Sequence, residues 1–181
     1  MGFQHLLDFN GYDHMLFLWM SFLGFTFWQY KRAFLHVTFF TLAHSLTLAF
    51  CVFQWLPISK EWVERSIALS IALQAAFSLI FRNNLKFNSI TSSALIFFFG
   101  LIHGMGFSGL LISLLGHSES IVIPLIIFNL GLELGQVLFV LGILLLQSTI
   151  HKYLNKITLH YMQISGALGL LLGLSLFISR F

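Results

Sequence analysis

Long apolar runs, each long enough to cross a membrane, fill most of this chain. A helix needs roughly 20 residues to cross the hydrocarbon of a bilayer. Backbone polar groups in lipid must be satisfied within their own segment, so the runs are expected to be helices. The uninterrupted run 141–146 lacks the alternation of a barrel strand. Six spans are expected, at residues 12–29, 34–56, 62–81, 90–115, 121–149 and 161–179.

Charged residues are too few to cover a water-soluble surface. They make up 8% of the 181 residues, while 58% are hydrophobic, and a soluble domain is nearer a quarter charged. We therefore predict an all-α fold, a single polytopic membrane bundle of about six transmembrane helices over residues 1–181. Its partner is the lipid bilayer, and the sequence leaves the oligomeric state open.

The basic residues are spread thinly in pairs between the apolar runs, which is typical of topology signals and argues against nucleic-acid binding. They follow the first, third and fifth spans. The positive-inside rule places these loops in the cytoplasm, so both termini are expected outside. The pairs are Lys31 with Arg32, Arg82 with Lys86, and Lys152 with Lys156.

Several ionisable residues lie within the apolar runs, where each costs roughly 2.5–3.5 kcal/mol to insert. Asp13 and His14 begin the first span, and His44, His103 and Glu133 lie near the middle of the second, fourth and fifth. Neutral imidazole and carboxylate are ligands of first-row divalent metals. We expect these five residues to bind nickel, cobalt or zinc, although a single histidine could equally bond a neighbouring helix.

Other polar residues accompany this set. Asn129, Glu133 and Gln136 share one face of the fifth span, because residues three or four apart lie on the same side of a helix. Ser45 follows His44, and Glu64 begins the third span. The additional candidates for metal binding or for a metal pathway are His5, Glu64, Ser45, Asn129 and Gln136.

Five sequence blocks follow one another along the chain: 11–18 (GYDHMLFL), 40–48 (FTLAHSLTL), 63–71 (VERSIALSI), 103–107 (HGMGF) and 129–136 (NLGLELGQ). In this order they resemble the HupE/UreJ family of bacterial membrane proteins. The resemblance implies a multi-pass nickel/cobalt permease of the bacterial inner membrane, of the kind associated with hydrogenase and urease systems. The family's first motif also has a histidine ahead of Asp-His, at a shorter spacing than that of His5 here.

Three other functions fit parts of the pattern. A metal-activated water near Ser45 would suit a membrane-embedded hydrolase of lipid amides. Residues 106–109 (GFSG) match the rhomboid protease pattern, but no histidine in the sixth span could activate Ser108, so we expect that serine to pack. A purely structural protein would use the histidines to bond helices. The chain has no phosphate-binding loop signature, which argues against ATP hydrolysis.

Overall fold

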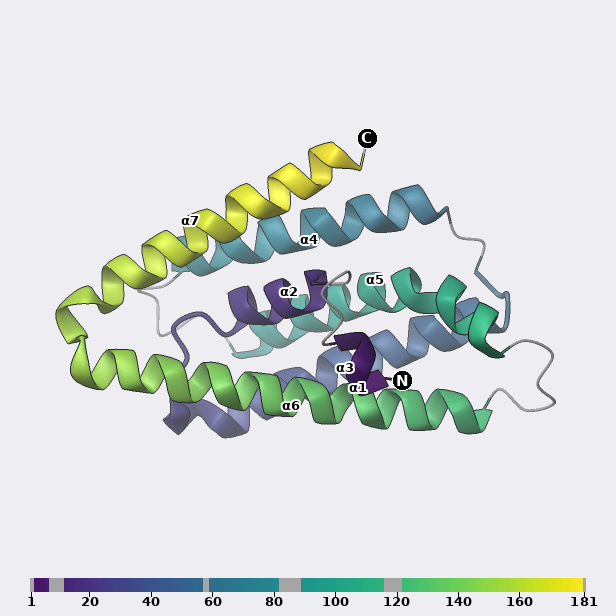
Figure 1. Ribbon diagram of the computed structural model, residues 1–181, viewed down its shortest axis with the longest axis horizontal. Coiled ribbons are helices and arrows are strands. Elements are labelled where there is room, and N and C mark those ends of the chain that lie inside the picture. Colours follow the sequence, from purple (N-terminus) through teal and green to yellow (C-terminus); the bar gives the residue numbers. More distant parts are fainter. Residues whose placement is uncertain (1, 7–11, 57–58, 82–88, 116–121, 181) are drawn as a thin grey trace.

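The computed structural model describes residues 2–6, 12–56, 59–81, 89–115 and 122–180. These residues form helices and turns, with no strand among them, so the all-α prediction is confirmed (Figure 1). In chain order the elements are α1 (Gly2–Leu6), α2 (Asp13–Ser21), the 3₁₀ turn η2 (Phe27–Gln29), α3 (Tyr30–Val52), α4 (Lys60–Phe81), α5 (Ser89–Leu115), α6 (Val122–Tyr153) and α7 (Asn155–Ser179).

Five segments of the described chain are long and apolar enough to cross a membrane. They agree with the second to sixth expected spans. The longest, α6, has 32 residues and measures about 48 Å at 1.5 Å per residue, so it exceeds the roughly 30 Å hydrocarbon core. The five segments are Phe27–Val52, Lys60–Phe81, Ser92–Ser113, Val122–Tyr153 and Ile157–Ser179.

The prediction of one continuous helix over residues 12–29 is wrong. Helix α2 has nine residues and spans only about 14 Å. It ends in a turn where Gly24 has a φ of 90°, a conformation that glycine adopts without strain. The buried side chain of Gln147 on α6 satisfies this turn, because it accepts from the Gly24 N–H and donates to the Phe22 carbonyl. With its backbone groups bonded in this way, the chain can leave the helix inside the bundle.

The short helices α1 and α2 lie within the bundle, and the N-terminus lies beside α6 (Figure 1). Close packing of α5 on α3 sets the geometry around them. A side chain at Gly100 would come within 2.6 Å of the Phe40 carbonyl oxygen, and one at Gly104 would collide with the His44 carbonyl. The two small residues therefore let the helix backbones touch, and they bring His44 and His103 close to each other.

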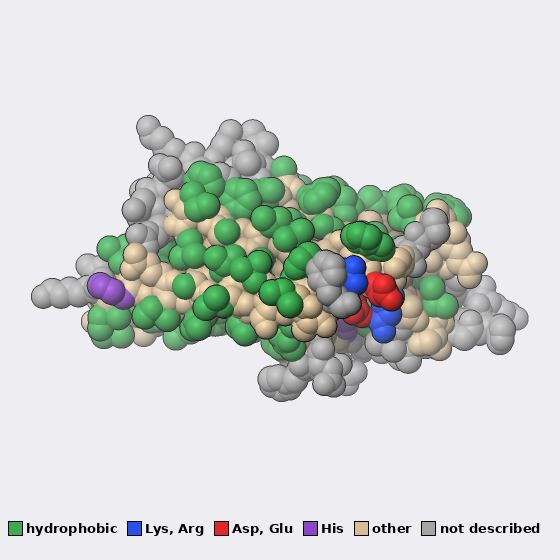
Figure 2. Space-filling view, turned by 90° about the horizontal axis from the view of Figure 1, so that it is seen from above, with side chains coloured by type: hydrophobic (Ala, Val, Ile, Leu, Met, Phe, Trp, Pro, Cys, Tyr) green, Lys and Arg blue, Asp and Glu red, His purple; other side chains and the backbone are tan. Residues whose placement is uncertain are grey.

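The outer face agrees with a lipid environment. Many large apolar side chains are exposed, including Leu130, Leu171 and Ile178, each more than 60% accessible. The face over α4 and α7 is mostly hydrophobic, with charged side chains gathered in one small area (Figure 2). Lys31 and Arg32 lie at the same end of the bundle as the close of α4, as the charge pattern predicts. Arg82 and Lys86 lie outside the described residues.

Candidate metal centre

Four histidine rings meet inside the bundle, each from a different helix. The ring of His14 on α2 is the centre of the group. Its centroid lies 4.9 Å from that of His5 on α1, 5.8 Å from that of His44 on α3 and 5.0 Å from that of His103 on α5. His14, His44 and His103 are at most 4% exposed. The structure thus unites the three expected histidines, and it adds His5 despite its unusual spacing.

We call His5, His14, His44 and His103 the histidine cluster. Its hydrogen bonds leave lone pairs of ring nitrogens available. Nδ1 of His103 lies 2.9 Å from the carbonyl oxygen of Phe99. A carbonyl can only accept, so Nδ1 carries the hydrogen and Nε2 keeps its lone pair for a ligand. Within the described part of the chain, His103 Nε2 and both ring nitrogens of His14 and His44 are buried without a hydrogen-bond partner. Such groups are costly to bury unsatisfied, and a bound cation would satisfy the lone pair of one nitrogen in each ring.

The rings are gathered but are not yet arranged around an ion. Among the described residues, no group of three histidine, cysteine, aspartate or glutamate side chains has the geometry to hold a metal. The rings of His14 and His103 pack edge to face, with an interplanar angle of 72°. Metal binding would therefore require these rings to rotate until their nitrogens converge at about 2.0–2.1 Å from the ion, the distance found for zinc.

Asp13 borders the histidine cluster and already has a cationic partner. Its Oδ1 lies 3.9 Å from His14 Nδ1, and its Oδ2 accepts from Arg180 Nη2 at 3.3 Å. Arg180 also donates to the backbone carbonyl of Glu64 at 2.8 Å, which ties the end of α7 to α2 and α4. The Glu64 side chain forms an exposed pair with Lys60 at 3.7 Å. Sequence reasoning missed Arg180, whose only signal was an arginine closing an apolar span.

Glu133 has a different set of neighbours. Its Oε1 accepts from Thr38 Oγ1 at 2.9 Å, and one turn along the same helix Gln136 Oε1 accepts from Thr41 Oγ1 at 2.6 Å. Glu133, Asn129 and Ser45 line a hollow between α3 and α6. The polar face predicted on the fifth span, now α6, therefore pairs with threonines of α3. No described contact joins Glu133 to the histidine cluster.

A layer of phenylalanines lies directly beside the histidine cluster. Phe17, Phe40 and Phe99 are each one helical turn from a histidine of the cluster, on α2, α3 and α5. The ring of Phe17 lies 5.3 Å from that of Phe40 and 5.5 Å from that of Phe99. All three are nearly or fully buried. We name these residues the phenylalanine layer. Sequence analysis missed it, although the phenylalanine three residues after His14 and those four residues before His44 and His103 were a visible signal.

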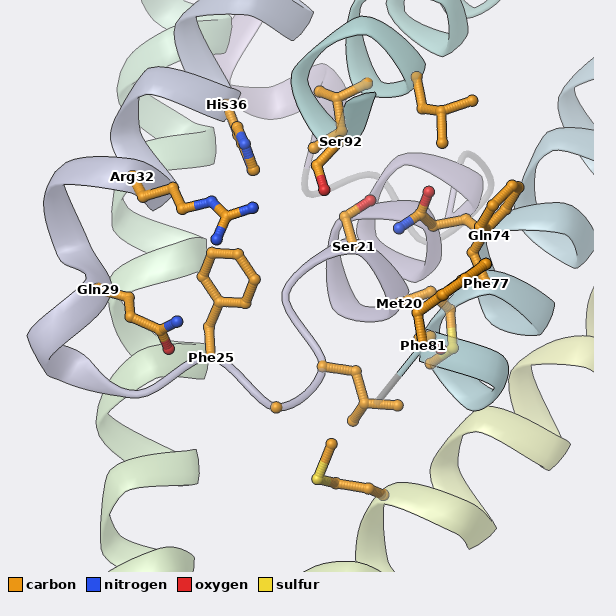
Figure 3. A pocket seen from close by; sticks show the side chains of 16 residues that line it. Met20, Ser21, Phe25, Gln29, Arg32, His36, Gln74, Phe77, Phe81 and Ser92 are labelled. Carbon is orange, nitrogen blue, oxygen red and sulfur yellow. The ribbon is translucent and has the colours of Figure 1, made fainter. Parts of the chain in front are cut away.

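Beyond the phenylalanine layer, residues of the same three helices, of α4 and of α7 line a cavity of about 170 Å³. Arg32 and His36 of α3 lie on one side of it, and Ser21 of α2, Gln74 of α4 and Ser92 of α5 on the other (Figure 3). Histidines, phenylalanines and cavity thus follow in order along α2, α3 and α5.

The serines considered for catalysis are bonded within their own helices. Ser108 Oγ donates to the Met105 carbonyl at 2.8 Å, and Ser45 Oγ donates to the Thr41 carbonyl at 2.6 Å. Neither hydroxyl donates to a histidine among the described contacts, so no described histidine is placed as the base that a serine nucleophile requires. This supports the expectation that Ser108 is a packing residue.

Comparison with known proteins gives one result that covers the whole chain. The family model described as HupE / UreJ protein matches residues 1–180. No curated protein and no solved structure gives a significant match.

Proposed function

Because the chain belongs to the HupE/UreJ family, which is associated with nickel/cobalt transport, we propose that it binds a divalent nickel or cobalt ion and lets it cross the bacterial inner membrane. One observation carries the proposal. Four histidine rings from four helices gather in an apolar bundle, and nitrogens of His14, His44 and His103 have no hydrogen-bond partner among the described residues. Nitrogen ligands suit nickel, cobalt and zinc, so ligand type alone does not separate these metals.

In this proposal the ion is the cargo and enters beside Asp13. Neutral imidazoles carry no charge, so a carboxylate is needed to offset the cation in a medium of low dielectric. Asp13 supplies that charge next to His14, and the ion competes there with Arg180. We propose that Glu133 supplies a second negative charge one helix away, with Asn129 and Gln136 orienting groups around it.

The path then meets the phenylalanine layer. Three packed aromatic rings give an ion neither ligands nor water, so the closed layer blocks permeation. Passage requires Phe17, Phe40 or Phe99 to move aside, after which the ion reaches the cavity lined by His36. That end of the bundle carries Lys31 and Arg32, and the positive-inside rule assigns it to the cytoplasm. The proposed path through the protein therefore connects the histidine cluster on the outer side with the cavity on the cytoplasmic side.

Binding and transport are tested on the same preparation. Protein purified in detergent is titrated with nickel and cobalt, and the same protein in liposomes enclosing a metal-sensitive dye reports uptake. The variant His103→Ala removes a nitrogen with an available lone pair, and His160→Ala is the matched control, because His160 is exposed on α7. We expect wild type and His160→Ala to bind about one ion per histidine cluster and to transport it, whereas His103→Ala does neither. Equal binding by all three proteins would refute the proposal.

A further inference from the structure

The cavity beyond the phenylalanine layer has a charge character that a cation pathway does not require. Arg32 lines it, and among the described residues no aspartate or glutamate does. The Nε of Arg32 is buried and has no hydrogen-bond partner among the described residues. Its guanidinium lies 5.7 Å from the ring of Phe25, and that contact does not supply a hydrogen-bond acceptor for the Nε–H. Arg32 is half-buried, and no carboxylate of the described residues is paired with it, although a guanidinium withdrawn from water is usually paired.

His36 adds a second unsatisfied group to the same cavity. It is 1% exposed, and neither of its ring nitrogens has a hydrogen-bond partner in the described part of the chain. One ring nitrogen of a neutral imidazole carries a hydrogen and can donate it. Figure 3 shows the His36 ring and the Arg32 guanidinium close to each other at one wall, facing the open centre of the cavity.

The opposite wall supplies further polar groups. The Ser92 hydroxyl and the Gln74 amide lie across the cavity from Arg32 (Figure 3). Hydroxyl and amide groups can both donate hydrogen bonds. Ser21 differs, because its hydroxyl already donates to the Phe17 carbonyl at 2.8 Å. The cavity therefore combines one fixed positive charge with donors on two sides.

We propose that this cavity binds a small oxyanion, of the size of acetate or inorganic phosphate. The guanidinium would hold two of its oxygens through parallel N–H bonds, the geometry in which arginine binds carboxylate and phosphate. His36, Ser92 and Gln74 complete the set of donors. The volume of about 170 Å³ holds such an ion together with a few waters, since a water occupies about 30 Å³ in the liquid. The anion neutralises Arg32 inside the bundle.

Lys31 offers an internal comparison for this inference. It precedes Arg32 on α3 and carries the same charge, but it is exposed and does not line the cavity. If the two residues served only as topology signals, their removal would have equal effects. The proposed site requires Arg32 alone.

The test is calorimetric titration of the full-length protein in detergent with sodium acetate and, separately, with sodium phosphate, at constant ionic strength. We expect saturable binding of at least one of the two anions. Arg32→Gln should weaken it at least tenfold, while Lys31→Gln stays within twofold of wild type. Arg32→Lys keeps the charge but loses the paired N–H groups, so it should bind with intermediate affinity. Size-exclusion profiles and nickel binding report whether each variant is folded.

Two results would overturn the inference. One is the absence of saturable binding of both anions to wild type, and the other is equal binding by wild type, Arg32→Gln and Lys31→Gln. Neither result touches the proposed metal function, because nickel binding is measured on the same samples and depends on the histidine cluster. Should Arg32→Gln fail to fold, Ser92→Ala replaces it and is expected to weaken anion binding several-fold.

Discussion

Two regions along α2, α3 and α5 carry sites of opposite character, built on the same helices. In one region the histidine cluster lies beside Asp13, and in the other His36 lies beside Arg32. Both regions hold buried histidine nitrogens without partners among the described residues. The neighbouring charge differs, and it decides what each region suits: a carboxylate favours a cation, whereas a guanidinium favours an anion. The phenylalanine layer separates the two.

The largest difference in nickel affinity is expected between a variant that lacks a histidine of the cluster and one that lacks His36. His103→Ala takes away a proposed ligand, so nickel affinity should fall by at least the roughly 10–100-fold that loss of an outer-shell partner costs at metal sites. His36→Ala removes a histidine of equal burial from the other region and should leave nickel affinity unchanged. Titration of both variants with nickel tests the comparison. Similar losses in the two variants would mean that the regions form one site.

The phenylalanine layer is tested by Phe40→Ala, with Phe98→Ala as control. Phe40 is fully buried, whereas Phe98 is 57% exposed on α5. Truncating a buried phenylalanine costs about 3–5 kcal/mol in soluble proteins, so Phe40→Ala should lower the unfolding temperature clearly more than Phe98→Ala. It should also raise nickel flux into liposomes, because the barrier between the two regions is thinner. Reduced flux with intact nickel binding would show that the layer does not block the path.

Arg180 tests whether the charge of Asp13 contributes to nickel binding at the histidine cluster. Replacing it by glutamine frees Asp13 while keeping a side chain that can still bond the Glu64 carbonyl. A partly exposed ion pair contributes about 1 kcal/mol at most, which corresponds to roughly fivefold in affinity. We therefore expect Arg180→Gln to bind nickel up to about fivefold more tightly, and Lys60→Gln, which alters the exposed Lys60–Glu64 pair, to have no effect. Weaker nickel binding by Arg180→Gln would contradict this competition and would mean that Arg180 holds Asp13 in place for the ion.

The smallest expected effect is that of the Arg32 charge on nickel binding at the histidine cluster. Arg32 lies about 18 Å along α3 from His44 by helical rise, and a single charge at that distance from a divalent ion in water contributes about 0.5 kcal/mol. Arg32→Gln should therefore tighten nickel binding roughly twofold in low salt, and the difference should vanish in high salt. A salt-independent change would point to a structural cause.

The fold class and the histidines within the spans could be predicted from the sequence, because both follow from hydropathy. An apolar run reveals a helix, and an ionisable residue within it stands out. The break after Ser21 could not be read in this way, because it depends on Gln147, more than a hundred residues later, bonding the turn. Only the three-dimensional structure brings His5 beside His14, and pairs Glu133 with Thr38. Local patterns do not report such distant contacts.

The cavity also could not be predicted from local sequence patterns. Lys31 and Arg32 look equivalent in sequence, as a basic pair between apolar runs. They differ only in which face of α3 they occupy, and that depends on how α2, α4 and α5 pack around the helix. Sequence identified the pair as a topology signal and could not single out Arg32.

The central claim is that the histidine cluster is the metal site. X-ray absorption at the nickel edge, measured on purified protein carrying one equivalent of nickel, tests it most directly. We predict the multiple-scattering signature of several imidazole ligands in wild type, with fewer imidazoles in His103→Ala and no change in His36→Ala. A nickel ion coordinated only by oxygen, or a spectrum unaffected by His103→Ala, would contradict the account.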